Sequence, residues 1–76
     1  MLHDNMYLDI NGVGHIFLIN RLNNKLYFFY KVDDVYRVAV FKFDPDFVLD
    51  CVDSSRKYLI VKSSKDQVHK YKVFNI

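Results

Sequence analysis

The sequence contains little glycine, proline or cysteine and no tryptophan. Two glycines and one proline in 76 residues argue against a disordered or low-complexity chain. The single cysteine, Cys51, excludes an intrachain disulfide and is typical of a reducing compartment. No signal-peptide core is present, and no apolar run approaches the roughly 20 residues that a membrane-spanning helix needs. We therefore expect a cytoplasmic protein with no membrane partner.

Motifs that carry enzymatic or metal chemistry are also missing. The sequence has no glycine-rich phosphate loop and no nucleophile elbow. The three histidines, His3, His15 and His69, lack the paired spacing of zinc ligands. The aspartates around Pro45 lack the terminal Glu of a calcium loop, and Cys51 lies in a predicted strand as a small core hydrophobe. We therefore expect no enzyme, no metal site and no cofactor.

The net charge is small and the two signs are interspersed. Eleven basic and nine acidic residues give a formal charge of +2. Such a chain attracts nucleic acid only weakly at long range, so any nucleic-acid binding would depend on local clusters of lysine and arginine.

The chain is rich in aromatic and β-branched residues, and no segment shows a helical period. The alternation and the turn residues predict strands at Met6–Ile10, Val13–Leu22, Lys25–Val32, Val35–Phe43, Phe47–Val52, Lys57–Lys62 and Gln67–Phe74. The connections are short, so neighbouring strands are expected to be antiparallel. We predict a single all-β domain over residues 1–76, a meander of about six to seven strands that forms a compact barrel or a two-sheet sandwich.

Three two-residue turns set the expected register of the first four strands. These turns are Asn11-Gly12, Asn23-Asn24 and Asp33-Asp34, which suit the type I′ conformation. They would pair Ile10 with Val13, Leu22 with Lys25, and Val32 with Val35. One face, the predicted core, then carries Met6, Leu8, Ile10, Val13, His15, Phe17, Ile19, Arg21, Leu26, Phe28, Tyr30, Val32, Val35, Arg37, Ala39, Phe41 and Phe43.

The three carboxy-terminal strands show a looser alternation. We expect Phe47, Leu49 and Cys51 to alternate with Val48, Asp50 and Val52. The inward positions are predicted to be Tyr58, Ile60, His69, Tyr71 and Val73, with Lys70 and Lys72 facing outward. The turn between the last two strands is predicted to span four residues, 63–66.

The opposite face of the first four strands is apolar, and this leads to a functional hypothesis. A soluble monomer rarely leaves several hundred Å² of contiguous apolar surface bare. We therefore predict that this face binds a target protein or a second copy, in the manner of an inhibitor or a viral accessory protein. The expected contact residues are Tyr27, Phe29, Tyr36, Val38 and Val40.

Two alternatives remain open at the level of sequence. Aromatic side chains edged by cations are typical of platforms for single-stranded nucleic acid, and here the cations and an additional ring would be Lys25, Lys31, Lys42 and Tyr7. The weaker alternative is a site for a small anion formed by Arg37 and His15 on the core face. Arg37 could instead reach solvent at the end of the sheet, stacked on Tyr30.

Overall fold

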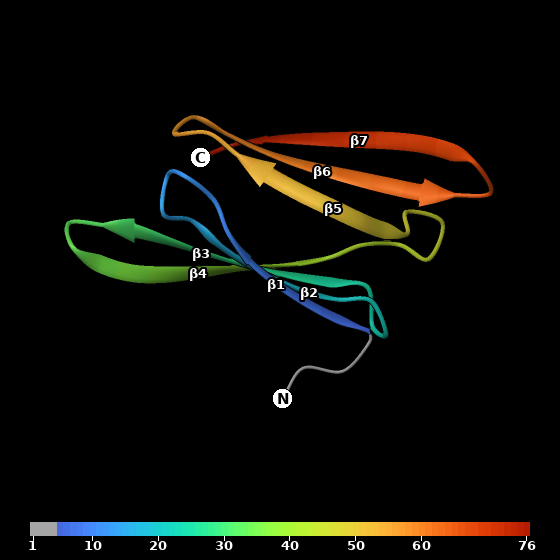
Figure 1. Cartoon of the computed structure of the whole chain (residues 1–76), viewed down its shortest axis with the longest axis horizontal. Coiled ribbons are helices and arrows are strands. Elements are labelled where there is room, and N and C mark those ends of the chain that lie inside the picture. Colours follow the sequence, from blue (N-terminus) through green and yellow to red (C-terminus); the bar gives the residue numbers. More distant parts are fainter. Residues whose placement is uncertain (1–4) are drawn as a thin grey trace.

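The computed structural model describes residues 5–76 as two antiparallel sheets that stack face to face (Figure 1). Sheet A has the order β1-β2-β3-β4, formed by Met6–Ile10, Ile16–Asn20, Lys25–Val32 and Val35–Lys42. Sheet B has the order β5-β6-β7, formed by Leu49–Ser54, Tyr58–Lys65 and Val68–Asn75. The all-β meander is confirmed, and it forms a sandwich and not a closed barrel. Within the described part of the chain, no helix is long and apolar enough to cross a membrane.

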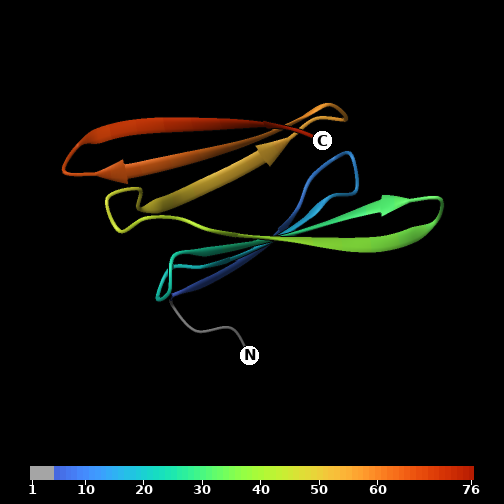
Figure 2. The same cartoon turned by 180° about the vertical axis from the view of Figure 1, so that it is seen from behind.

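The core lies between the two layers, and the view from behind shows the same stacking (Figure 2). Its buried side chains come from β2, β3, the β4–β5 connection, β5 and β6. They are Phe17, Ile19, Leu26, Phe28, Phe43, Phe47, Leu49, Leu59 and Val61. Aromatic rings stack within it, with centroids 5.5 Å apart for Phe17 and Phe28. Five of these residues, Phe17, Ile19, Leu26, Phe28 and Phe43, were predicted to be core, and Phe47 and Leu49 were predicted to share one face of their strand.

The turn between β3 and β4 has the predicted form. Asp33 and Asp34 both have positive φ angles, 51° and 62°, and Val32 pairs with Val35. This is the signature of a type I′ turn, which matches the twist of the flanking strands. In Figure 1 the tip of this hairpin extends past the end of sheet B. That extension explains why Val32 and Val35, predicted to be core, are exposed.

The first hairpin differs from the prediction. Ile10 pairs with Ile16, and residues 11–15 form the connection in place of a two-residue turn. The pairing is displaced by an odd number of residues, which reverses the faces of β1. Leu8 and Ile10, predicted to be core, are 51% and 63% exposed on the outer face of sheet A. The side chain of Asn11 stabilises this longer loop, because its Oδ1 accepts hydrogen bonds from the backbone N–H groups of residues 13 and 15, each at 3.1 Å.

The second hairpin is displaced by an even number of residues, which preserves the faces. Asn20, and not Leu22, pairs with Lys25, so the turn spans residues 21–24. Side chains two residues apart point to the same side of a strand. The predicted core positions of β2 and β3 therefore stay inside, although their partners across the ladder change.

Strands β6 and β7 have the opposite orientation to the prediction. Leu59, Val61 and Ser63 of β6 are buried, whereas Tyr58 and Ile60 are exposed. The turn between β6 and β7 is a two-residue turn at Asp66-Gln67, with φ angles of 53° and 63°, and not a four-residue turn over 63–66. The predicted inward residues of β7, which are His69, Tyr71 and Val73, lie on the exposed outer face.

Lysine and cysteine positions in sheet B follow from this orientation. Lys72 faces inward, where its Nζ lies 4.9 Å from the Phe47 ring centroid and 5.6 Å from that of Phe43. An ammonium group over aromatic faces is favourable at a partly wet edge of a core. A bulge between Leu49 and Cys51 shifts the alternation of β5. Cys51 is consequently exposed, contrary to the prediction that it is a core residue.

Candidate interaction surfaces

The outer face of sheet A carries an apolar surface, which we call the platform. The strand register places its apolar side chains in two adjacent rows across all four strands. The first row is Ile10, Ile16, Phe29 and Val38, and the second is Leu8, Leu18, Tyr27 and Val40. The residues on edge strand β4 are the most open in the predicted contact set, with Val38 51% and Val40 54% exposed.

Lysines border the platform at both ends. Lys25 and Lys42 pair with each other at one end, and Lys31 pairs with Tyr36 at the other. The Lys31 Nζ lies 5.2 Å from the Tyr36 ring centroid, within cation–π range. The only carboxylate on the strands of sheet A belongs to Asp9, which pairs with the inward-facing Phe17. The platform is therefore apolar in its centre and bordered by lysines, with Asp33 and Asp34 in the turn beyond Lys31 and Tyr36.

The structure brings most of the predicted surface residues together. All five predicted protein-contact residues and all three predicted lysines lie on the outer face of sheet A. Tyr7 does not, because the reversal of β1 turns it to the inner face, where the Arg21 guanidinium carbon lies 5.8 Å from its ring centroid. The same reversal adds Leu8 and Ile10, which the sequence assigned to the core. The facing of β1 could not be predicted because the first loop is longer than the two-residue turn expected from Asn11-Gly12.

The outer face of sheet B forms a second exposed surface, which we call the second apolar face. Its apolar side chains are Tyr58, Ile60, Tyr71 and Val73, all of which are exposed. Its charges are mixed, in contrast to those of the platform. Asp53 pairs with Ile60, and the Asp50 carboxylate lies 3.7 Å from the Lys62 Nζ while it accepts a hydrogen bond from the Ser64 hydroxyl at 2.8 Å.

His15 lies at a hollow of about 460 Å³ beside the first loop. The hollow is lined by Val13, Gly14, His15, Lys31, Tyr36 and Arg56. The His15 Nδ1 lies 2.6 Å from the Ser54 Oγ, which also accepts a hydrogen bond of 2.6 Å from the Asn11 side chain. Burial lowers the pKa of His15 below 6.5, which favours the neutral imidazole at pH 7. Arg37 is absent from this hollow and pairs with Tyr30 on β3, so the predicted pair of anion ligands is not brought together.

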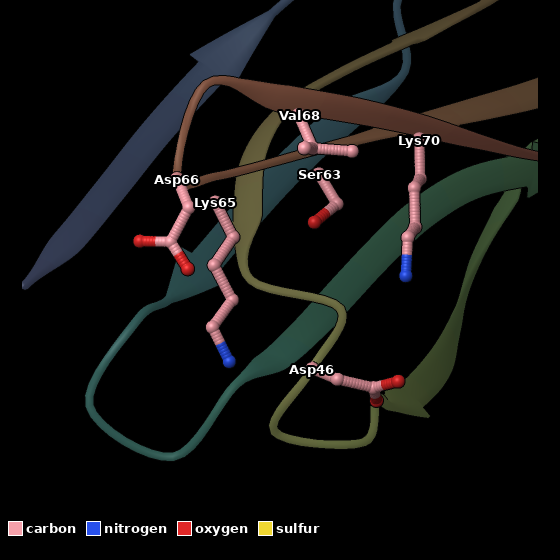
Figure 3. Close-up of a pocket in the computed structure, with 6 residues that line it drawn as sticks. All are labelled: Asp46, Ser63, Lys65, Asp66, Val68 and Lys70. Atoms are coloured by element: carbon pink, nitrogen blue, oxygen red, sulfur yellow. The ribbon is translucent and has the colours of Figure 1, made fainter.

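A smaller pocket of about 250 Å³ opens between the β6–β7 turn and the β4–β5 connection. Figure 3 shows Lys65 and Lys70 extending from sheet B toward the connection that carries Asp46, with the Ser63 hydroxyl inside. Two lysines and two aspartates line this pocket, so it favours neither sign of charge. Among residues 5–76, no three His, Cys, Asp or Glu side chains are grouped so that they could hold a metal ion.

The pockets and the outer faces differ in chemistry. The pocket beside the β6–β7 turn is lined by charges of both signs, whereas the outer faces of sheets A and B carry rows of apolar side chains on paired strands. Comparison of the chain with models of protein families, with curated protein sequences and with solved structures finds no match in any of the three.

Proposed function

We propose that this chain is a non-enzymatic interaction module that binds protein through the platform. The observation that supports the proposal is the double row of apolar side chains on the outer face of sheet A. These rows cross four strands without interruption by a polar side chain. Contiguous apolar surface of this kind marks a binding site in soluble proteins far more often than it stays exposed to water.

The chemistry of the platform fits a protein surface. Tyr27, Phe29 and Tyr36 offer large aromatic side chains with only two rotatable bonds each, so ordering them on binding costs little entropy. Their backbone is already held in the ladder between β2, β3 and β4. A partner would therefore gain apolar contact area without first ordering a loop.

The proposal can be tested by site-specific crosslinking in the cell of origin. A photoreactive amino acid at position 38 on the platform is expected to form adducts with protein. The same group at position 22 is the control, because Leu22 is exposed in the 21–24 turn and outside the rows. Equal yields of protein adduct from the two positions would contradict the proposal.

A second candidate function, binding of single-stranded nucleic acid, is favoured by one specific observation. The lysines at both ends of the platform share a face with three aromatic rings, and no strand carboxylate lies on that face. Bases could stack on the rings while the lysines contact phosphates. Fluorescence anisotropy with a short oligonucleotide at low salt measures this directly. Lys42→Ala and Tyr36→Ala should each weaken binding, whereas Lys57→Ala in the β5–β6 turn should not, and an absence of binding would exclude this function.

A further inference from the structure

We infer that the platform binds the second apolar face of another copy of this chain, so that copies stack head to tail. This inference rests on the proposed function, since it requires the platform to be a protein-binding surface. It accounts for a feature that the proposed function leaves aside, namely that both outer faces of the sandwich are apolar. Each copy would then have its platform covered by one neighbour and its second apolar face covered by another.

Charge complementarity favours this arrangement. The platform contributes Lys25, Lys31 and Lys42 and no strand carboxylate. The second apolar face contributes the carboxylates of Asp50 and Asp53 on edge strand β5 and one ammonium group, that of Lys62, which lies 3.7 Å from Asp50. Acidic groups therefore outnumber basic ones on the strands of this face. Apolar centres then meet, and the cationic ends of one face lie against a face that contains acidic groups. Opposite charges across an interface raise the rate of association and select the partner.

The same charges oppose the symmetric alternative. Two platforms packed on each other would place six lysines in one interface without a compensating strand carboxylate. Like charges that face each other disfavour association. Two second apolar faces packed together would leave the apolar rows of both platforms exposed to water. Head-to-tail contact covers both kinds of face with a single type of interface.

Sheets of this chain already pack face to face in the interior of the molecule. The inner faces of sheets A and B already stack as two layers through apolar and aromatic side chains (Figure 1). Head-to-tail contact continues the same alternation of layers from one copy to the next. An interface between two different faces forms a closed ring when the rotation between copies closes, and an open chain when it does not. Assembly beyond a dimer is therefore expected.

Two surface variants test the inference by complementation. Val38→Lys blocks the platform, and Val73→Lys blocks the second apolar face; the two valines are 51% and 60% exposed, so both variants are expected to fold. Wild-type protein should associate beyond a dimer as its concentration rises in sedimentation velocity. Each variant alone should be monomeric, with association about 30-fold weaker or more, as expected for a charge placed in the centre of an apolar contact. Leu22→Lys, which adds the same charge in a turn, should assemble like the wild type.

The mixture of the two variants gives the decisive result. Val38→Lys retains an intact second face and Val73→Lys retains an intact platform, so together they should form a one-to-one dimer that grows no further. Dimerisation of Val73→Lys by itself would show that platforms bind each other and would overturn the inference. A wild-type protein that stays monomeric, while position 38 crosslinks to other proteins, would overturn the inference but leave the proposed function standing. Absence of both association and crosslinks would overturn both.

Labelling and salt provide two checks that need no variant. Cys51 is the single cysteine and lies exposed on the second apolar face, paired with Lys62. A bulky maleimide at this thiol should block self-association and leave the labelled protein able to bind only through its platform. Raising the salt concentration should weaken head-to-tail contact, because it screens the lysine–aspartate attraction. Association that strengthens with salt and is insensitive to the label would contradict the inference.

Discussion

At the scale of single residues, two asparagine side chains join the layers of the sandwich. Asn11 donates to the Ser54 carbonyl oxygen at 3.0 Å and so ties the first loop to β5. Asn24 donates to the carbonyl oxygens of Phe43, Asp44 and Phe47 and accepts from the Leu49 N–H, at 2.9 to 3.2 Å. The sequence indicated both residues as turn formers. Their side chains also satisfy backbone groups on segments distant in the chain.

Removal of the Asn24 side chain should therefore destabilise the fold. Asn24→Gly keeps the φ angle of 57° accessible and deletes only the four hydrogen bonds. We expect a loss of about 2–4 kcal/mol in the free energy of unfolding, because part-buried carbonyl groups lose their donor. Urea denaturation measures the loss. Asn23→Gly, at the exposed neighbouring position, is the control, and equal midpoints for the two variants would contradict the role of Asn24.

His15 should make stability depend on pH. Its pKa in the folded protein is lowered from 6.5 by burial, so below pH 6.5 the unfolded chain binds the proton more readily. The contribution of this group is complete above pH 6.5 and is lost as the pH falls toward the lowered pKa of the folded state. We expect the urea midpoint to fall as the pH is lowered through 6.5, and to fall less in His15→Gln. Identical pH profiles for the two proteins would contradict this expectation.

At the scale of elements, the hairpins differ in what determines them. The β3–β4 hairpin is specified locally, because two adjacent aspartates adopt positive φ and fix the pairing of Val32 with Val35. The β1–β2 connection is determined by side-chain bonds of Asn11, both within the loop and to β5. The turn dipeptide alone therefore predicts the register of the β3–β4 hairpin, but it does not predict that of the β1–β2 hairpin.

The β3–β4 turn can be strengthened by substitution. Replacing Asp33-Asp34 with Asn-Gly puts glycine at one of the two positions with positive φ, where a residue with a side chain is strained. The replacement keeps the same turn type. We expect an increase of about 0.5–1 kcal/mol in the free energy of unfolding. Asp34→Val should lower it by about 1–2 kcal/mol, because a β-branched residue is strained at a φ of 62°. Thermal denaturation followed by circular dichroism measures both changes, and a destabilised Asn-Gly variant would contradict the assignment of the turn.

At the scale of the whole molecule, neither sheet has a core of its own. Phe17 and Phe28 of sheet A and Leu59 and Val61 of sheet B belong to one buried cluster. A chain of this length has a free energy of unfolding of about 4–11 kcal/mol, so the shared cluster leaves little excess stability. The two sheets are therefore expected to unfold together.

A core substitution in one sheet should report on both sheets. Leu59→Ala is expected to lower the free energy of unfolding by about 2–5 kcal/mol, because Leu59 is fully buried and its removal leaves a cavity. Far-ultraviolet circular dichroism follows the strands of both sheets, and tyrosine fluorescence follows the local environment of the rings. Coincident transitions by the two probes are expected. A separate early transition for sheet B would show that sheet A is stable by itself.

The sequence by itself determined the fold class, the meander and the inner faces of β2 and β3. These features depend on a period of two and on local turn residues, which the sequence shows directly. The platform residues Tyr27, Phe29, Tyr36, Val38 and Val40 were predictable for the same reason, since a shift of two residues between β2 and β3 leaves the faces unchanged.

Only the tertiary structure decided the faces of β1 and of sheet B. A single-residue change in loop length or a bulge reverses the side chains that follow on that strand. Neither the bonds of Asn11 to Ser54 nor the bulge between Leu49 and Cys51 is visible as a local pattern. The longer first loop turns Leu8 and Ile10 outward, where they extend the platform. The packing of sheet B on sheet A leaves Tyr71 and Val73 outside, where they form a second apolar face. Alternation along a strand shows that two faces exist, but packing between sheets decides which of them is buried.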